Sequence, residues 1–216
     1  MYSSLENQLK EKGVRLVAVS KTQALDKVQA IYDQGQRIFG ENRVQELVVK
    51  QKELPKDIEW HVIGSLQTNK VKHIASFVSL IHSVDSLNLV KKINQEAIKH
   101  NRIIPILLQV KISNEESKQG FEIEELNDLL EHNSLDEFNN IRIDGLMGMA
   151  SFTSDLVQVR TEFLILNQLF DHYKKTHFKT NSFEIKSMGM SGDYELAIEC
   201  GSNMVRIGSL IFGSRD

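Results

Sequence analysis

The stretch Leu16-Val17-Ala18-Val19-Ser20-Lys21 decides the fold, because it is the first of several short apolar runs with the same sequel. Its β-branched residues are typical of a strand, and in residues 22–34 an apolar side chain recurs at Leu25, Val28 and Ile31, as in a helix. A strand followed by a helix is the unit from which parallel, helix-covered sheets are built. The chain therefore begins with one predicted βα unit.

Seven further apolar runs follow, so the chain contains eight predicted strands. They are residues 16–21, 37–42, 60–64, 80–85, 104–110, 141–149, 183–189 and 204–213. Segments with helical periodicity separate them. Nearly continuous apolar strands are typical of a parallel sheet buried on both faces, and eight βα repeats favour a closed (β/α)8 TIM-type barrel over an open doubly wound sheet. Residues 2–12 predict an extra N-terminal helix, which we expect to close the barrel floor.

The composition is that of an ordinary globular protein, with 216 residues of which 41% are hydrophobic and 25% charged. Nothing resembles a linker, so we predict one domain, residues 1–216. A net charge of −3 argues against general binding to nucleic acid or anionic membranes. One cysteine, Cys200, fits a reducing compartment. Without a secretory leader or an apolar run of membrane-spanning length, we expect a cytoplasmic protein.

Lys21 ends the first predicted strand, where the loops of such a barrel carry the chemistry. Alternation along the strand places Lys21 on the same side as Val17 and Val19. A lysine that faces the barrel interior is partly desolvated, which disfavours its ammonium form and makes it a usable nucleophile. The alternative is a surface lysine with a packed stem and an ammonium group in water.

The last two predicted strands carry loops that look suited to an anion. After the seventh strand, Ser191 and Gly192 precede a predicted helix whose free N–H groups attract phosphate. Gly208 and Ser209, which we place in the eighth strand, supply a second pair of donors. Phosphate sites after strands seven and eight recur in this class of barrel. An amine and a phosphate site together suggest a phosphorylated aldehyde held as a Schiff base.

Arg206 shares one side of the eighth predicted strand with Gly208, and a buried arginine needs an acceptor. The acceptor is either a ligand heteroatom or a carboxylate such as that of Glu41 or Asp144. The histidines show no metal-ligand spacing, and we expect His61 to be a hydrogen-bonded core residue.

Six motifs of this chain resemble those of the pyridoxal phosphate homeostasis proteins, which are single-domain relatives of the alanine racemase N-terminal barrel. The resemblance covers the chain from roughly residue 4 to residue 213. The six motifs are Ala18-Val19-Ser20-Lys21-Thr22, Phe39-Gly40-Glu41-Asn42, His61-Val62-Ile63-Gly64-Ser65-Leu66-Gln67-Thr68-Asn69-Lys70, Gly145-Leu146-Met147-Gly148-Met149, Ser187-Met188-Gly189-Met190-Ser191-Gly192-Asp193 and Val205-Arg206-Ile207-Gly208.

The resemblance implies a fold-type III barrel without a C-terminal β-domain, and pyridoxal 5′-phosphate (PLP) as cofactor, bound to Lys21 as a Schiff base. It implies that Arg206 faces the pyridine nitrogen and that Asn42 lines the pocket. Phosphate contacts are implied from Ser191, Gly192, Gly208 and Ser209. The implied function is intracellular storage and delivery of PLP by a monomer, with PLP-dependent apoenzymes as partners and no strong catalytic activity.

Three other functions compete with this carrier. An amino-acid racemase of the same fold takes its second base from a tyrosine of an added C-terminal β-domain. We expect no such domain here, and none of the four tyrosines, Tyr2, Tyr32, Tyr173 and Tyr194, is predicted at the mouth of the barrel. A Schiff-base aldolase usually places its lysine on a later strand. A purely structural barrel leaves the paired glycine loops without a purpose.

Overall fold

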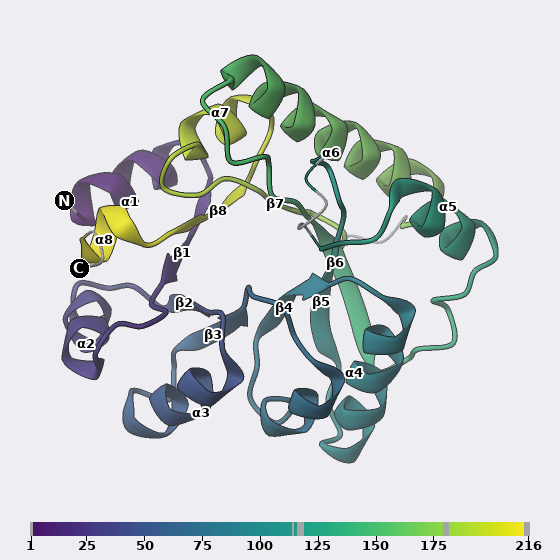
Figure 1. Ribbon diagram of the computed structural model, residues 1–216. Helices are drawn as coiled ribbons and strands as arrows, with labels where there is room; N and C mark the ends of the chain where they lie inside the picture. Colours follow the sequence, from purple (N-terminus) through teal and green to yellow (C-terminus); the bar gives the residue numbers. More distant parts are fainter. Residues whose placement is uncertain (1, 114, 116–118, 179–181, 214–216) are drawn as a thin grey trace.

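Eight parallel strands form a closed barrel in the computed structural model, which describes residues 2–113, 115, 119–178 and 182–213 (Figure 1). The strands are β1 (Arg15–Val19), β2 (Ile38–Glu41), β3 (Glu59–Val62), β4 (Leu80–Val84), β5 (Ile104–Gln109), β6 (Ile141–Met147), β7 (Ile185–Ser187) and β8 (Met204–Ile207). Each pairs with its neighbour in chain order, and β8 closes the barrel on β1 with Ala18 opposite Ile207. The predicted (β/α)8 barrel is confirmed.

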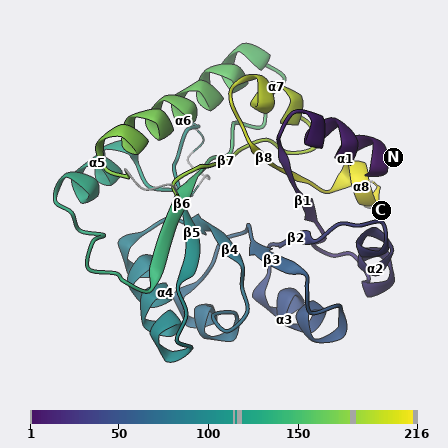
Figure 2. The same ribbon diagram turned by 180° about the vertical axis from the view of Figure 1, so that it is seen from behind.

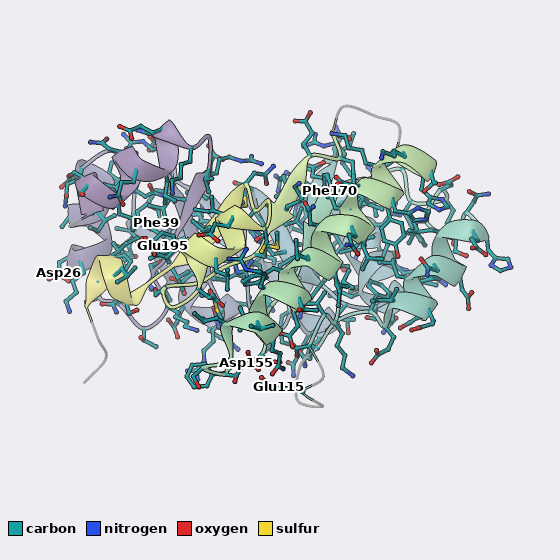
Figure 3. All side chains as sticks on the ribbon, turned by 90° about the horizontal axis from the view of Figure 1, so that it is seen from above. Asp26, Phe39, Glu115, Asp155, Phe170 and Glu195 are labelled. Carbon is teal, nitrogen blue, oxygen red and sulfur yellow. The ribbon has the colours of Figure 1, made fainter. Side chains whose placement is uncertain are left out.

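Helices surround the strands, as the two opposite views in Figures 1 and 2 show. They are α1 (Tyr2–Glu11), α2 (Leu25–Asp33), α3 (Val44–Glu53), the 3-10 helix η1 (Thr68–His73), α4 (Leu87–Lys99), α5 (Ile123–Glu131), α6 (Leu156–Thr176), α7 (Tyr194–Glu199) and α8 (Ser209–Phe212). The longest helix, α6, is capped at its N-terminus by Asp155, whose carboxylate accepts hydrogen bonds from the N–H groups of Val157 and Gln158. Figure 3 shows Asp155 at one end of α6 and Phe170 farther along it. No described helix is long and apolar enough to cross a membrane.

The extra N-terminal helix is present, but it does not close the floor of the barrel. Both end views show α1 in the outer ring beside α8 (Figures 1 and 2). Because α8 has only four residues, it cannot cover the outer face where β8 meets β1. The buried side chains of Tyr2, Leu5 and Leu9 give α1 an apolar face that packs there instead.

The eighth strand is shorter than predicted. It ends at Ile207, and the apolar residues that follow form the single turn of α8, so Ser209 begins a helix rather than extending a strand. Gly208 stands between the two elements. The error has a physical cause, since one helical turn is too short to show a period of 3.6 residues.

Interior residues change character along the strands. On two strands, an apolar interior residue is followed two positions later by a polar one. Leu80 is followed by His82 on β4, and Met204 is followed by Arg206 on β8. The apolar members form a small core inside the barrel, made of Val17, Leu80, Leu107, Met147, Ile185 and Met204. The polar members lie toward the carboxyl ends of the strands, where the loops begin.

Candidate functional site

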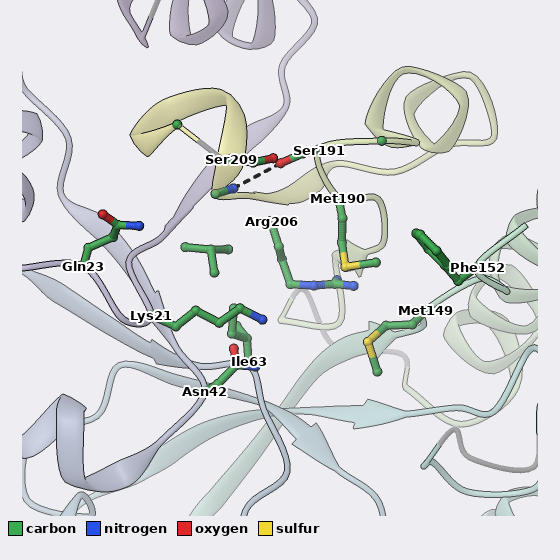
Figure 4. A pocket seen from close by; sticks show the side chains of 14 residues that line it. Lys21, Gln23, Asn42, Ile63, Met149, Phe152, Met190, Ser191, Arg206 and Ser209 are labelled. Atoms are coloured by element: carbon green, nitrogen blue, oxygen red, sulfur yellow. Dashed lines mark hydrogen bonds between the residues drawn. The ribbon is translucent and has the colours of Figure 1, made fainter. Parts of the chain in front are cut away.

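A cavity of about 430 Å³ lies at the carboxyl ends of the strands (Figure 4). All seven residues that the sequence predicted for the site line it: Lys21, Asn42, Ser191, Gly192, Arg206, Gly208 and Ser209. Its volume is in the range of small-molecule pockets, roughly 300–1,000 Å³. The barrel thus brings the loops after β1, β2, β7 and β8 to one place.

Lys21 extends into the cavity from a tightly held turn (Figure 4). The N–H of Gln23 donates to the carbonyl of Ser20 across the turn at 3.0 Å. Thr22 has a φ of 64°, a left-handed conformation that is rare for a β-branched residue, and its N–H donates to the carboxylate of Glu46 at 2.8 Å. These bonds fix the direction in which Lys21 leaves the backbone.

A buried ion pair supports this turn from outside the barrel. Lys50, on α3, donates to the carbonyl of Ser20 and to Oε1 of Glu41, both at 2.6 Å. The Ser20 hydroxyl donates to the same carboxylate oxygen at 2.6 Å, while Oε2 of Glu41 has no hydrogen-bond partner in the described part of the chain. Burial raises the pKa of Glu41, against the opposing hydrogen bonds from Lys50 and Ser20.

Backbone donors gather on the β7 and β8 side of the cavity. The N–H of Gly208 donates to the hydroxyl of Ser191 at 3.3 Å, the bond drawn in Figure 4. Within the described residues, the N–H groups of Ser191, Gly192 and Ser209 have no protein acceptor. Gly189 allows the turn, because its φ is 95° and a Cβ there would lie 2.7 Å from that of Ala197. Such an arrangement of unsatisfied N–H groups suits an anion.

Arg206 is a buried cation whose hydrogen-bonded acceptors are neutral. Nη1 donates to the hydroxyl of Ser187 at 2.7 Å and Nη2 donates to the carbonyl of Gly148 at 3.1 Å. The expected alternative of an ion pair with Glu41 or Asp144 is wrong, because each of these carboxylates pairs with another cation. Burial lowers the pKa of Arg206 to about 10. A buried guanidinium with neutral acceptors favours an electron-rich ligand atom at the cavity.

His61 is a hydrogen-bonded core residue, as predicted. Its Nδ1 lies 3.0 Å from Nε2 of His82, whose Nδ1 lies 3.0 Å from Oγ of Ser187. Burial, followed by the positive charge of Arg15, lowers the pKa of His61 to about 3. Burial also holds the pKa of His82 well below its usual value, with smaller contributions from His61 and Arg206. Both rings are therefore neutral at physiological pH.

Seven further residues of the cavity wall were not among those that sequence reasoning assigned to the site. They are Val19, Gln23, Ile63, Met149, Phe152, Met190 and Gly213. Ile63 could have been found, because it lies two residues after His61 and so shares its side of the strand. Phe152 lies in a loop after β6 and carries no periodic signal. Its side chain is 97% exposed, and its N–H donates to the carboxylate of Glu115 at 2.6 Å.

The geometry combines a lysine amine, an anion-binding group of backbone N–H donors and a fixed guanidinium. Lys21 and Arg206 enter the same space from neighbouring strands, and Ser191 and Ser209 lie at one side of it (Figure 4). The amine can condense with an aldehyde, the N–H donors can bind a phosphate, and the guanidinium can donate to a ring nitrogen.

Known proteins show the same fold and related sequences. The family model of the alanine racemase N-terminal domain matches residues 2–216. The pyridoxal phosphate homeostasis protein of Aquifex aeolicus (strain VF5) is 40% identical over 206 residues, covering 95% of this chain and 89% of that protein. The chain therefore belongs to the alanine racemase N-terminal domain family, and within it to the pyridoxal phosphate homeostasis proteins.

Solved structures agree on the architecture. PipY of Synechococcus elongatus PCC7942 superposes with a TM-score of 0.92 and 33% identity in its structure without PLP, each chain being 98% covered. In the structure of PipY with PLP bound, the TM-score is 0.88 and the identity 32%, again over 98% of each chain. Alanine racemase of Clostridium difficile 630 shares the fold at a TM-score of 0.74 and 16% identity, over 97% of this chain and 54% of the racemase.

Proposed function

We propose that this protein binds pyridoxal 5′-phosphate at Lys21 and serves PLP homeostasis by storing and delivering the cofactor. The observation that carries the proposal is the joint placement of Lys21, Arg206 and the unsatisfied N–H groups of the Ser191 and Ser209 loops around one cavity. The membership of the chain in the homeostasis family and the PLP bound to the related PipY support it.

The residues of the cavity fit the chemical groups of PLP. The amine of Lys21 would condense with the aldehyde, with loss of one water, to give a Schiff base. Arg206 would donate to the pyridine nitrogen, and its fixed charge would disfavour protonation there. Asn42 lines the wall on the Lys21 side. The phosphate would be bound by Ser191, Gly192, Gly208 and Ser209. PLP itself supplies electron-withdrawing chemistry when bound, and a ring nitrogen beside a cation makes it a weak electron sink.

The cavity favours a carrier over a racemase. Of the fourteen residues that line it, only Lys21 and Arg206 have titratable side chains. A racemase needs a second base on the far side of the substrate, and none of the four tyrosines is among the lining residues. Each tyrosine hydroxyl instead bonds elsewhere, as Tyr173 does to Asn127 at 2.7 Å. We therefore propose no strong catalytic activity, with a PLP-dependent racemase as the alternative.

The wider context of the function is also proposed. Residues 1–216 would act as one PLP-binding domain, since the barrel closes between Arg15 and Ile207. We propose a monomer, because the fourteen described residues that line the cavity come from one chain. PLP-dependent apoenzymes would receive the cofactor, in the cytoplasm, where a buried free thiol such as Cys200 is stable.

The experiment that tests the proposal is reduction of the purified protein with borohydride after incubation with PLP. We expect a visible absorption band that borohydride removes, and a single reduced adduct that peptide mapping places on Lys21. Lys21→Ala should abolish both, whereas Lys27→Ala, on the exposed side of α2, should change neither. An unchanged adduct in Lys21→Ala would reject the assignment of Lys21.

A separate assay addresses the enzymatic alternative. The PLP-loaded protein is incubated with L-alanine in deuterium oxide, and both enantiomers and Cα exchange are followed. We expect neither racemisation nor exchange above free PLP. Rapid stereospecific turnover that depends on Lys21 would establish the racemase instead.

A further inference from the structure

A chain of hydrogen bonds crosses the barrel interior behind the cavity. It runs from Nη1 of Arg206 to Oγ of Ser187 (2.7 Å), from Ser187 to Nδ1 of His82 (3.0 Å), and from Nε2 of His82 to Nδ1 of His61 (3.0 Å). The four residues come from β8, β7, β4 and β3, and all are buried. Only Arg206 among them lines the cavity. The other three are therefore polar groups in the core that the proposed binding site does not use directly.

Donor and acceptor rules give the chain one direction. A guanidinium only donates, so the oxygen of Ser187 accepts from Arg206. The Ser187 hydroxyl, fully buried, has one hydrogen, and Nδ1 of His82 is the acceptor within reach. A neutral His82 that accepts at Nδ1 carries its hydrogen on Nε2, which then donates to Nδ1 of His61. Every bond thus points away from Arg206, and both rings are assigned the neutral Nε2–H tautomer.

This direction has a consequence for the charge of the site. If His61 became a cation, its Nδ1–H would face the Nε2–H of His82, so both hydrogen bonds of His82 would have to reverse. The Ser187 oxygen would then accept from both His82 and Arg206, and the buried Ser187 hydroxyl would lose the acceptor for its hydrogen. A cationic His82 would in addition place a second charge close to Arg206. The chain therefore keeps both rings neutral and leaves the positive charge on the guanidinium.

The chain also fixes the orientation of Arg206. Within the described part of the chain, two of its five N–H donors are used, one by Ser187 and one by the carbonyl of Gly148. Because the two bonds are made by different nitrogens of one planar group, the guanidinium cannot rotate without breaking them. Its remaining donors are left for the cavity that Arg206 lines.

We propose that Ser187, His82 and His61 are positioning residues, which hold Arg206 as an oriented cation against the ring nitrogen of the cofactor. The inference rests on the proposed function, since it assumes that this nitrogen faces Arg206. It goes beyond it by assigning a role to three side chains that do not line the cavity.

The first test uses the wild-type protein without cofactor. Nitrogen-15 spectra of labelled protein report the tautomer of each histidine ring and the rotation of each guanidinium. Between pH 6 and 8 we expect His61 and His82 as neutral Nε2–H tautomers and separate, slowly exchanging Nη1 and Nη2 signals for Arg206. A cationic ring, an Nδ1–H tautomer or a freely rotating guanidinium would overturn the proposal, and no variant has to fold for this result.

The second test measures binding of PLP labelled with nitrogen-15 in its ring. His82→Leu and Ser187→Ala break the chain, whereas His82→Asn keeps an oxygen that can accept from Ser187. Met204→Leu is the matched control, an interior residue of β8 outside the chain. We expect the dissociation constant for PLP to rise at least roughly tenfold in His82→Leu and Ser187→Ala. A rise of this size corresponds to the loss of one hydrogen bond to a charged group. The ring-nitrogen signal should move in these two and stay in place in His82→Asn and Met204→Leu.

The outcomes separate this inference from the proposed function. If the wild type binds no PLP, the proposed function fails, while the histidine spectra still test the chain. If PLP binds to every folded variant with the wild-type constant and the same ring-nitrogen signal, the chain is only structural and the inference is rejected.

Discussion

The buried pair of Glu41 and Lys50 supports the turn that carries Lys21. Lys50 donates both to the Glu41 carboxylate and to the carbonyl of Ser20, the residue before Lys21. Replacing Lys50 with Met leaves a buried carboxylate without its cation, which costs about 3–5 kcal/mol when the charge is retained. We expect Lys50→Met to destabilise the protein strongly at pH 8, as measured by urea unfolding.

The free energy of unfolding of Lys50→Met should depend on pH in a way that identifies the charge of Glu41 as the cause of the destabilisation. The pKa of Glu41 is already raised by burial, and loss of Lys50 raises it further. A raised folded-state pKa means that stability is present below the unfolded pKa and is lost as the pH rises through the folded one. Lys50→Met should therefore be less destabilised at pH 5 than at pH 8, and Glu41→Gln/Lys50→Met should remove this difference. Equal losses at both pH values would contradict the assignment.

The buried histidines predict a loss of stability in mild acid. Burial lowers the folded-state pKa of His61 to about 3 and that of His82 well below 6.5, so the unfolded chain takes up protons first as the pH falls. Their stabilising contribution is complete above pH 6.5 and declines below it, by up to about 1.4 kcal/mol per pH unit for each ring. We expect urea unfolding to show a loss of about 2–3 kcal/mol between pH 7.5 and 5.5.

A variant comparison identifies the source of that slope. His61→Gln should remove one ring's share of the slope, while the exposed His132→Gln should leave it unchanged. If both variants keep the wild-type slope, other groups cause the acid lability.

Two of the predicted residues that line the cavity share a simple property. Lys21 and Arg206 could be placed because alternation along a single strand determines which side chains face the barrel interior. The Glu41–Lys50 pair could not, because it joins a strand to a helix face, and packing of that helix is not encoded in local periodicity. The same reason explains why the sequence offered Glu41 as a partner for Arg206: on β2 it faces outward, toward α3.

At the scale of elements, the short α8 and the extra α1 explain one another. An eighth helix of four residues leaves the outer face near β1 uncovered, and α1 fills that place in the ring. Leu9, which is 1% exposed, belongs to the buried apolar face of α1 that makes this contact. Leu9→Ala should cost about 2–5 kcal/mol in the free energy of unfolding, the usual range for a buried leucine. Lys10→Ala, on the exposed face of α1, should change it by less than about 0.5 kcal/mol.

Thermal and urea unfolding of the two variants are the measurements for this contact. If Leu9→Ala proves as stable as Lys10→Ala, then α1 is not a structural part of the barrel. The sequence pattern predicted that α1 is a helix but not where it packs. Its position depends on the shortness of α8, and the apolar run after Ile207 had been predicted as part of the eighth strand.

At the scale of the whole molecule, core and site occupy successive levels of one barrel interior. Apolar residues such as Leu80 and Met204 fill the lower level, and the polar residues two positions later, His82 and Arg206, form the next level, of which Arg206 lines the cavity. A ligand held between β1 and the loops of β7 and β8 therefore bridges the seam at which the barrel closes. Binding at this seam should stabilise the entire fold, because β1 and β8 come from opposite ends of the chain.

This coupling makes stability a measure of cofactor binding. A ligand that binds only the folded state stabilises it by RT ln(1 + [L]/Kd), about 2.7 kcal/mol when free PLP is 100 times its Kd. The midpoint temperature of thermal unfolding should therefore keep rising as the PLP concentration increases. In Lys21→Ala the shift should shrink but remain measurable, since Arg206 and the phosphate-binding N–H groups are still present. Lys27→Ala should retain the full shift, and an equal shift in Lys21→Ala would mean that the amine of Lys21 adds nothing to retention of the cofactor.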